Sequence, residues 1–284
     1  MTDPTTSEAA TAATAAGHAH EHEPEAAPPG FVSDPMWVRL LNDPDSGFAA
    51  GRGFFRMLPS SPRCKMCAAP FAGPSAPFMR MLDRGRWDKN PSICGLCFKQ
   101  LEKARGGAEV QLSMLFADVR GSTGLAERMG PGAFQALLGR FYREATNALV
   151  AQDGIIDKFV GDEVVGLFLP VLAGQDHAQH AIDAAQDLLR ATGQGSEGGP
   201  WIPVGAGVHT GLAYVGAIGD TVTDFTALGD SVNVTARLAS AAAAGEILVS
   251  ADAADAAGLD PSLETRTLSL RGRTEPLDVR VLRV

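Results

Sequence analysis

The second half of the chain alternates between apolar runs of strand length and longer stretches with helical periodicity. Compact apolar runs predict strands at 111–118, 155–160, 163–169 and 246–250, and the middle two form a hairpin that turns at Gly161 and Asp162. Apolar residues at helical spacing predict helices at 131–152, 175–191 and 231–243. Two further strand pairs are predicted, 202–209 with 212–218 turning at Thr210 and Gly211, and 263–270 with 277–284. The mixture, which contains no internal repeat, predicts an α+β fold with helices on a largely antiparallel sheet.

The first third of the chain has a different character. Residues 1–30 consist largely of Ala, Thr, Glu and Pro, so we expect a disordered tail. An apolar stretch around Trp37, within 31–58, predicts a short helix that docks on the following module or on a partner chain. We therefore divide the chain into a tail at 1–30, a four-cysteine module with its preceding helix at 31–107, and an α+β domain at 108–284.

The four cysteines form two CxxC pairs, Cys64 with Cys67 and Cys94 with Cys97. Two such pairs can present four thiolates to one tetrahedral ion, which lets a small segment fold without a large core. We expect structural Zn²⁺ in a zinc-ribbon-like module. An iron–sulfur cluster, a thiol switch and plain packing cysteines are the alternatives.

Composition narrows the possible function classes. No apolar run reaches the ~18–20 residues of a membrane span, and residues 1–29 lack the regions of a signal peptide, so we expect a cytoplasmic protein. The net charge of −9 argues against nucleic-acid binding by the whole chain. Residues 51–105 are the exception, because this stretch contains eleven Lys and Arg residues and only three acidic residues. This basic surface is either simply solvated or meets a phosphate-bearing partner.

Two aspartates stand where predicted strands end. Asp118 ends one apolar run and precedes a turn with Gly121, Ser122 and Thr123, while Asp162 follows the glycine of the hairpin. If these strands are neighbours, the carboxylates converge at one edge of the sheet. Such a pair suits Mg²⁺, which keeps waters and binds substrate phosphates. Turn formation and helix capping are the structural alternatives.

Asn233 and Arg237 are four residues apart and share one face of the predicted helix 231–243. An amide donor beside a guanidinium can hold a phosphorus centre and its equatorial oxygens. A solvated helix face is the structural alternative.

Four stretches resemble class III nucleotidyl cyclase catalytic domains in order and spacing: FADVRGST, KFVGDEVVGLF, VGAGVHTGLAYVGAIG and LGDSVNVTARL. The resemblance covers residues 110–284. It implies a ferredoxin-like cyclase fold and a homodimer with two composite sites. It also implies ATP or GTP as substrate, with two Mg²⁺ or Mn²⁺ ions per site. In the implied reaction the ribose 3′-hydroxyl attacks the α-phosphorus and pyrophosphate leaves.

The resemblance implies a role for each matching position. Metal binding falls to Asp118, the carbonyl of Val119, and Asp162; phosphate binding falls to Gly121, Ser122 and Thr123. Lys158 and Thr226 match the base-reading positions, and Asn233 and Arg237 match the pair that orients the ribose and stabilises the transition state. The turn departs from many relatives at Arg120 and Ser122, and Arg120 can contact phosphate or pair across the dimer.

Lys158 also favours adenine on physical grounds. A lysine ammonium only donates hydrogen bonds, which fits the acceptor N1 of adenine and not the protonated N1 of guanine. The hydroxyl of Thr226 can accept from the exocyclic amine. We therefore predict an adenylate cyclase, with the four-cysteine module as a regulatory or dimer-positioning unit. A guanylate or relaxed-specificity cyclase and a non-catalytic nucleotide-binding signalling module are the alternatives.

Overall fold

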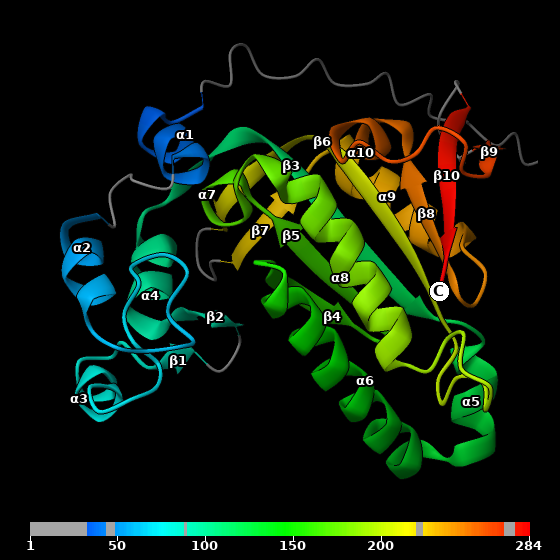
Figure 1. Ribbon diagram of the computed structural model, residues 1–284, viewed down its shortest axis with the longest axis horizontal. Helices are drawn as coiled ribbons and strands as arrows, with labels where there is room; N and C mark the ends of the chain where they lie inside the picture. The colour runs from blue at the N-terminus through cyan, green and yellow to red at the C-terminus, as the bar shows by residue number, and fades with distance from the viewer. Residues whose placement is uncertain (1–32, 44–48, 88–89, 220–223, 270–275) are drawn as a thin grey trace, which may run out of the picture. The chain divides into compact units, whose positions relative to one another are not determined.

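An eight-stranded sheet forms the centre of the C-terminal two thirds of the chain (Figure 1). Its strands are β3 (Gly106–Val119), β4 (Ile155–Val160), β5 (Glu163–Phe168), β6 (Val204–Ile218), β7 (Asp224–Leu228), β8 (Glu246–Ser250), β9 (Thr265–Leu268) and β10 (Leu277–Arg283). They run in the order β4-β5-β3-β6-β8-β10-β9, and β7 pairs with β6. Each described pairing in this sheet is antiparallel except that of β6 with β8. The predicted α+β class with a largely antiparallel sheet is confirmed.

The computed structural model describes residues 33–43, 49–87, 90–219, 224–269 and 276–284. The tail predicted at 1–30 lies outside these residues. Residues Ser33–Val284 form one compact unit, and β3 begins at Gly106, just before the predicted boundary at 107. The division into a four-cysteine module and an α+β domain therefore stays a prediction about folding units.

The central strand β3 is buried on both faces, because its successive side chains enter two different cores. Leu112, Met114 and Phe116 belong to one core, and Leu115, Ala117 and Val119 belong to the other. The second core includes residues of α6 (Pro131–Ala151), α8 (His177–Ala191) and α10 (Ala251–Ala256). The first includes residues of α1 (Pro35–Asn42), α4 (Gly95–Lys103) and α9 (Asp230–Ala241). The sheet thus lies between two layers of helices.

The predicted turn at Thr210 and Gly211 is wrong. β6 continues through both residues and pairs with β3 from Val204, opposite Val119, to Ala217, opposite Gly106. The Thr210 hydroxyl lies 2.6 Å from the Ser113 hydroxyl within the core. A Cβ added at Gly211 would lie 2.4 Å from the Ser231 hydroxyl at the start of α9. Close approach of α9 therefore requires the glycine there, and no turn forms.

The other predicted long elements are present with small shifts of their ends. The hairpin of β4 and β5, helices α6, α8 and α9, strand β8, and the closing pair β9 and β10 are confirmed. Sequence patterns missed several shorter elements, namely α5 (Ser122–Met129), α7 (Pro170–Ala173), the 3-10 helix η1 (Gly174–Asp176), β7 and α10.

The upstream segment consists of short elements around the cysteines. They are α1, α2 (Ala49–Met57), α3 (Ala76–Met81), β1 (Arg86–Trp87), β2 (Asn90–Cys94) and α4. The predicted helix around Trp37 is α1. It packs mainly on the sheet, against β3 and β7, so the predicted docking on the four-cysteine module is wrong in its main part. The Trp37 ring is fully buried and stacks on Phe225 of β7 with a centroid distance of 6.2 Å, while its Nε1 donates to the Ala104 carbonyl at 2.9 Å.

Within the ranges given above, none of the helices has both the length and the hydrophobicity that a bilayer crossing needs.

Candidate functional site

Asp118 and Asp162 converge at the end of β3. The N–H of Val119 donates to the Asp162 carbonyl at 3.3 Å, which fixes the β4–β5 turn against the end of the central strand. A cleft of about 360 Å³ opens there, and its lining is residues 118–123 together with Asp162. The structure therefore brings the predicted metal-binding and phosphate-binding residues into one cleft.

Three carboxyl groups share this edge of the sheet, because Glu163 lies opposite Asp118 in the β3–β5 register. Burial, with a further contribution from Asp162, raises the pKa of Asp118 to about 6, and Arg120 opposes this shift. Burial, together with Asp118 and Asp162, raises the pKa of Glu163 to about 7. Carboxylates that disfavour one another's ionisation are stabilised by a bound divalent cation, and an all-oxygen donor set fits Mg²⁺ or Mn²⁺.

Arg120 contacts groups of its own chain. Its guanidinium forms an ion pair with the Asp118 carboxylate and donates to the carbonyls of Ser240 at 3.0 Å and Ala242 at 3.3 Å. Since these carbonyls lie at the C-terminal end of α9, Arg120 places a cation where the helix dipole favours one. The contacts of Arg120 to phosphate or across a dimer stay predictions.

The turn after β3 leads directly into α5. Gly121 is the N-cap residue with φ of 67°, a left-handed conformation that glycine adopts without strain. Ser122 and Thr123 are the first two residues of the helix. The unpaired N–H groups of a first helical turn, together with the helix dipole, make a suitable site for phosphate oxygens.

Lys158 on β4 and Thr226 on β7 are in direct contact, outside the cleft at Asp118. The Lys158 ammonium donates to the Thr226 hydroxyl at 3.0 Å, although the two residues are far apart in sequence and lie on β4 and β7. Asp157, which sequence reasoning missed, joins them: it accepts from the Thr226 hydroxyl at 3.0 Å and lies 3.3 Å from the ammonium. The predicted base-reading pair is therefore a cluster of three side chains.

Asn233 and Arg237 occupy one face of α9, as their spacing predicts. Asn233 is exposed and Arg237 is half-buried. Neither belongs to the lining of the cleft at Asp118, and neither do Lys158 and Thr226. Within one chain, the predicted residues thus fall into separate groups: the acidic cleft, the Lys158 cluster and the α9 face.

Two acidic residues beside the site were not among the predicted site residues. Asp157 directly precedes Lys158, and Glu163 directly follows Asp162. Strict alternation along a strand would place such neighbours on opposite faces. An irregularity in β4 and the turn at Gly161 change that expectation.

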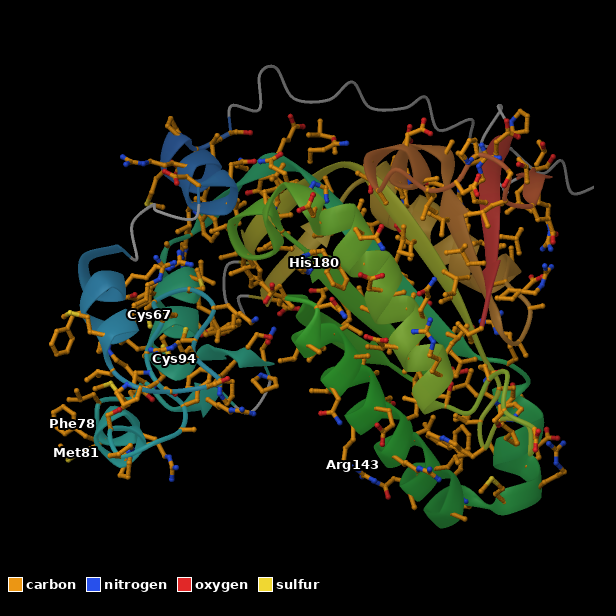
Figure 2. The ribbon with its side chains drawn as sticks, in the orientation of Figure 1. Cys67, Phe78, Met81, Cys94, Arg143 and His180 are labelled. Carbon is orange, nitrogen blue, oxygen red and sulfur yellow. The ribbon has the colours of Figure 1, made fainter. Side chains whose placement is uncertain are left out.

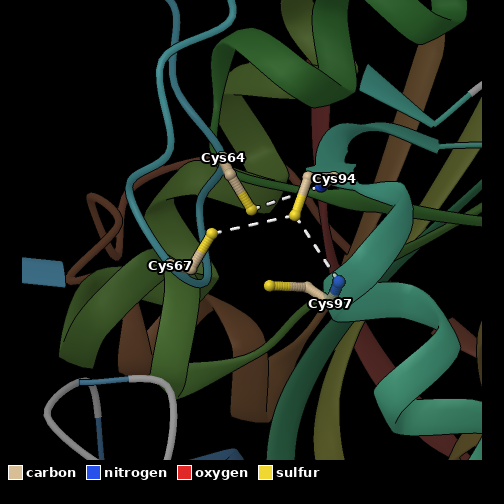
Figure 3. Close-up of side chains that lie close together, drawn as sticks. All are labelled: Cys64, Cys67, Cys94 and Cys97. Atoms are coloured by element: carbon tan, nitrogen blue, oxygen red, sulfur yellow. Dashed lines mark hydrogen bonds between the residues drawn. The ribbon is translucent and has the colours of Figure 1, made fainter. Parts of the chain in front are cut away.

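The four cysteines converge on one point, as Figure 3 shows. Their sulfurs all lie within 4.8 Å of one another, and those of Cys67 and Cys94 are 3.7 Å apart. Four sulfurs bound to one tetrahedral zinc ion at ~2.3 Å would be about 3.8 Å apart. Hydrogen bonds from Cys64 and the other thiols lower the pKa of the Cys67 thiol, and the Arg84 guanidinium lies 3.4 Å from its sulfur. The geometry and the donor set fit a structural metal ion.

The four-cysteine segment also holds the strand that carries Lys158. The Asn90 amide donates to the Ile156 carbonyl at 3.2 Å, and the Ser92 hydroxyl donates to the Gly154 carbonyl at 3.0 Å. Lys65 forms an ion pair with Asp153, just before β4. Asn90 and Ser92 belong to β2, which ends at Cys94, so the four-cysteine cluster and an edge strand of the sheet are joined by two hydrogen bonds.

Comparison with known proteins gives a consistent result. Residues 107–275 match the sequence model described as "Adenylate and Guanylate cyclase catalytic domain". The chain is 34% identical over 135 residues to "Adenylate cyclase" of Anabaena cylindrica, a match that covers 45% of this chain and 26% of that protein. It is 32% identical over 134 residues to "Adenylate cyclase 1" of Rhizobium meliloti strain 1021, covering 45% of this chain and 20% of that protein. The chain therefore matches only a small part of these relatives.

Solved structures agree with the sequence match. The guanylyl cyclase Cya2 superposes with a TM-score of 0.56 at 28% identity, covering 62% of this chain and 93% of that one. The adenylyl cyclase CyaB from P. aeruginosa superposes with a TM-score of 0.54 at 28% identity, covering 63% of this chain and 96% of that one. The chain is thus structurally similar both to a guanylyl cyclase and to an adenylyl cyclase.

Proposed function

The chain belongs to the class III adenylate and guanylate cyclase family, and on this premise we propose that it is an adenylate cyclase that works as a homodimer. The proposed reaction converts ATP to 3′,5′-cyclic AMP and pyrophosphate. The observation that carries the choice of ATP is the contact of Lys158 with Thr226. A donor-only ammonium beside a hydroxyl acceptor matches the acceptor N1 and the donor amine of adenine.

The side chains divide the chemistry between them. Asp118, the Val119 carbonyl and Asp162 would hold two divalent ions, which supply activation of the ribose 3′-hydroxyl and neutralise charge on the phosphates. Ser122 and Thr123 would bind the phosphates at the start of α5. Asn233 would orient the ribose, and Arg237 would stabilise the charge that develops on the α-phosphate oxygens. The bond from the α-phosphorus to the 3′-oxygen forms as the bond to pyrophosphate breaks, and the hydroxyl proton passes to water.

A homodimer is proposed because these groups do not share one cleft. The lining of the acidic cleft lacks Lys158, Thr226, Asn233 and Arg237. A twofold dimer can bring the acidic cleft of one protomer to the other groups of its partner, which makes two composite sites. The four-cysteine segment, in this proposal, binds one structural Zn²⁺ per chain and steadies the strand of Lys158.

Turnover by the purified chain tests the substrate. With Mg²⁺ or Mn²⁺, we expect cyclic AMP and pyrophosphate from ATP, and a kcat/KM for GTP that is lower by about 100-fold or more, because the wrong base leaves buried polar groups unpaired. Exchange of both readers, Lys158→Glu with Thr226→Cys, is expected to reverse the preference.

The same assay separates the alternatives. The similarity to the guanylyl cyclase Cya2 makes a GTP-using enzyme the second candidate. Equal turnover of ATP and GTP, unchanged by the double exchange, would establish relaxed specificity. Nucleotide binding without pyrophosphate release under either metal would establish a non-catalytic signalling module.

Mixing two inactive variants tests the composite site. Asp118→Ala disables the acidic cleft and Asn233→Ala disables the α9 face, so each homodimer is expected to be inactive. A heterodimer contains one intact site, and random mixing should restore about a quarter of the wild-type activity per chain. The measurement is cyclic AMP formation after the chains are unfolded and refolded together. Two Asp118→Ala preparations treated in the same way are the control. An inactive mixture whose heterodimers are demonstrated by mass would contradict the composite site.

A further inference from the structure

The register of β4 changes at the residue before Lys158. Ile156 pairs with Gly166 and Lys158 pairs with Val165, so that Asp157 is an extra residue in this strand. In a regular strand, neighbouring side chains point to opposite faces. A bulge removes that alternation and re-aims side chains locally. Because of it, the adjacent side chains of Asp157 and Lys158 both reach the hydroxyl of Thr226.

The direction of each hydrogen bond in this cluster is fixed by the chemistry of its ends. A lysine ammonium has protons and no lone pair, and an ionised carboxylate has lone pairs and no proton. The Thr226 oxygen must therefore accept from Lys158 at 3.0 Å, and its proton must point at Asp157 Oδ2 at 3.0 Å. A hydroxyl can rotate in general, but this one has a single orientation that satisfies both neighbours.

We propose that Asp157 determines base specificity by holding the Thr226 hydroxyl proton, so that Thr226 presents only a lone pair to the base. The inference rests on the proposed adenylate cyclase function and adds a positioning residue to it. Adenine offers an amine donor beside an acceptor nitrogen, and guanine offers an acceptor oxygen beside a donor nitrogen. A Thr226 that cannot donate matches the first pattern and leaves the guanine oxygen unpaired.

The surroundings of Asp157 argue against a role in stability alone. Its side chain is only 3% exposed, and within the described part of the chain its Oδ1 is buried without a hydrogen-bond partner. A buried acceptor without a partner lowers stability, so a stabilising role does not by itself account for a carboxylate at this position. The contacts that remain are those of Oδ2 with the Thr226 hydroxyl and the Lys158 ammonium.

The test compares Asp157→Asn and Asp157→Leu with the wild-type enzyme. Asparagine can donate to Thr226 through its amide, and leucine lets the hydroxyl rotate, so both changes allow Thr226 to donate to guanine. The ratio of kcat/KM for ATP to that for GTP is expected to fall at least about 10-fold in both variants. The matched control is Asp255→Asn, an exposed acid on α10, which should keep the wild-type ratio.

Binding of non-cyclisable ATP and GTP analogues, measured by calorimetry, gives a second readout that does not need turnover. A loss of preference in both variants supports the proposal. An equal loss of affinity for both analogues, with the preference retained, would show a merely structural role and overturn it. A wild-type chain without any preference would overturn the adenylate assignment together with this inference, so the two failures are distinguishable.

Discussion

Replacing Asp162 with asparagine is expected to lower cyclase turnover by at least about 100-fold, since a lost metal contact removes several kcal/mol of transition-state stabilisation and ~1.4 kcal/mol is tenfold in rate. Asparagine keeps the size of the side chain and loses its charge. The main-chain carbonyl of Asp162, which accepts from the Val119 N–H at 3.3 Å, is unchanged. The end of β3 and the β4–β5 turn should therefore keep their positions.

The variant separates a catalytic role from a structural one. The charge of Asp162 contributes to the raised pKa values of Asp118 and Glu163, so its removal should bring both back toward their usual range and should not lower the melting temperature. Activity is measured as cyclic AMP formation over a titration of Mn²⁺. Asp252→Asn, at an exposed acid on α10, is the control. Turnover within a few-fold of wild type, with unchanged metal dependence, would exclude Asp162 as a metal ligand.

Replacing Cys94 with serine is expected to remove the bound metal ion and to lower the melting temperature by roughly 10 °C or more, since structural zinc sites supply several kcal/mol of folding free energy. Cys94 is the N-cap residue of α4 as well as one of the four converging sulfurs. Serine can keep the cap, because its oxygen also accepts from the helix N–H groups. The loss is then attributable to the metal site.

Elemental analysis and thermal unfolding check this prediction. We expect about one zinc per wild-type chain and none in the variant. Met81→Ser is the control, because this α3 side chain is 74% exposed and lies away from the cysteines (Figure 2). Iron in the wild-type protein would point to an iron–sulfur cluster instead. If the wild-type chain contains no metal and is only as stable as its Cys94 variant, the cysteines have a packing role and bind no metal.

Periodicity predicted those elements whose stability is mostly local. The hairpin of β4 and β5 follows from two apolar runs around Gly161 and Asp162, and α6 follows from a long stretch that opens with Pro131. Strand β6 was predicted as two strands because Thr210 and Gly211 have turn chemistry. Only the long partner β3, almost a hundred residues earlier, keeps β6 straight through that point. Non-local pairing of this kind is not visible in a window of sequence.

The candidate site shows the same division. Asp118, Asp162 and the small-residue turn stand at strand ends, and the structure collects them in one cleft. The role of Asp157 depends on a one-residue bulge and on β7, an element whose pattern was not recognised. Arg120 could not be placed either, because its partners at Ser240 and Ala242 follow from how α9 packs on the sheet.

The upstream segment determines where this chain can be shortened or fused to another protein. The family match begins at residue 107, yet Trp37 stacks on the residue before Thr226, and Asn90 binds the carbonyl two residues before Lys158. A shortened chain that starts at 107 would uncover Phe225 and leave β4 as an unsupported outer strand, a site for self-association. A fusion of this cyclase domain to a foreign sensor domain should therefore begin at residue 33. The contacts of Trp37 and Asn90 with the sheet are then kept in the fusion protein.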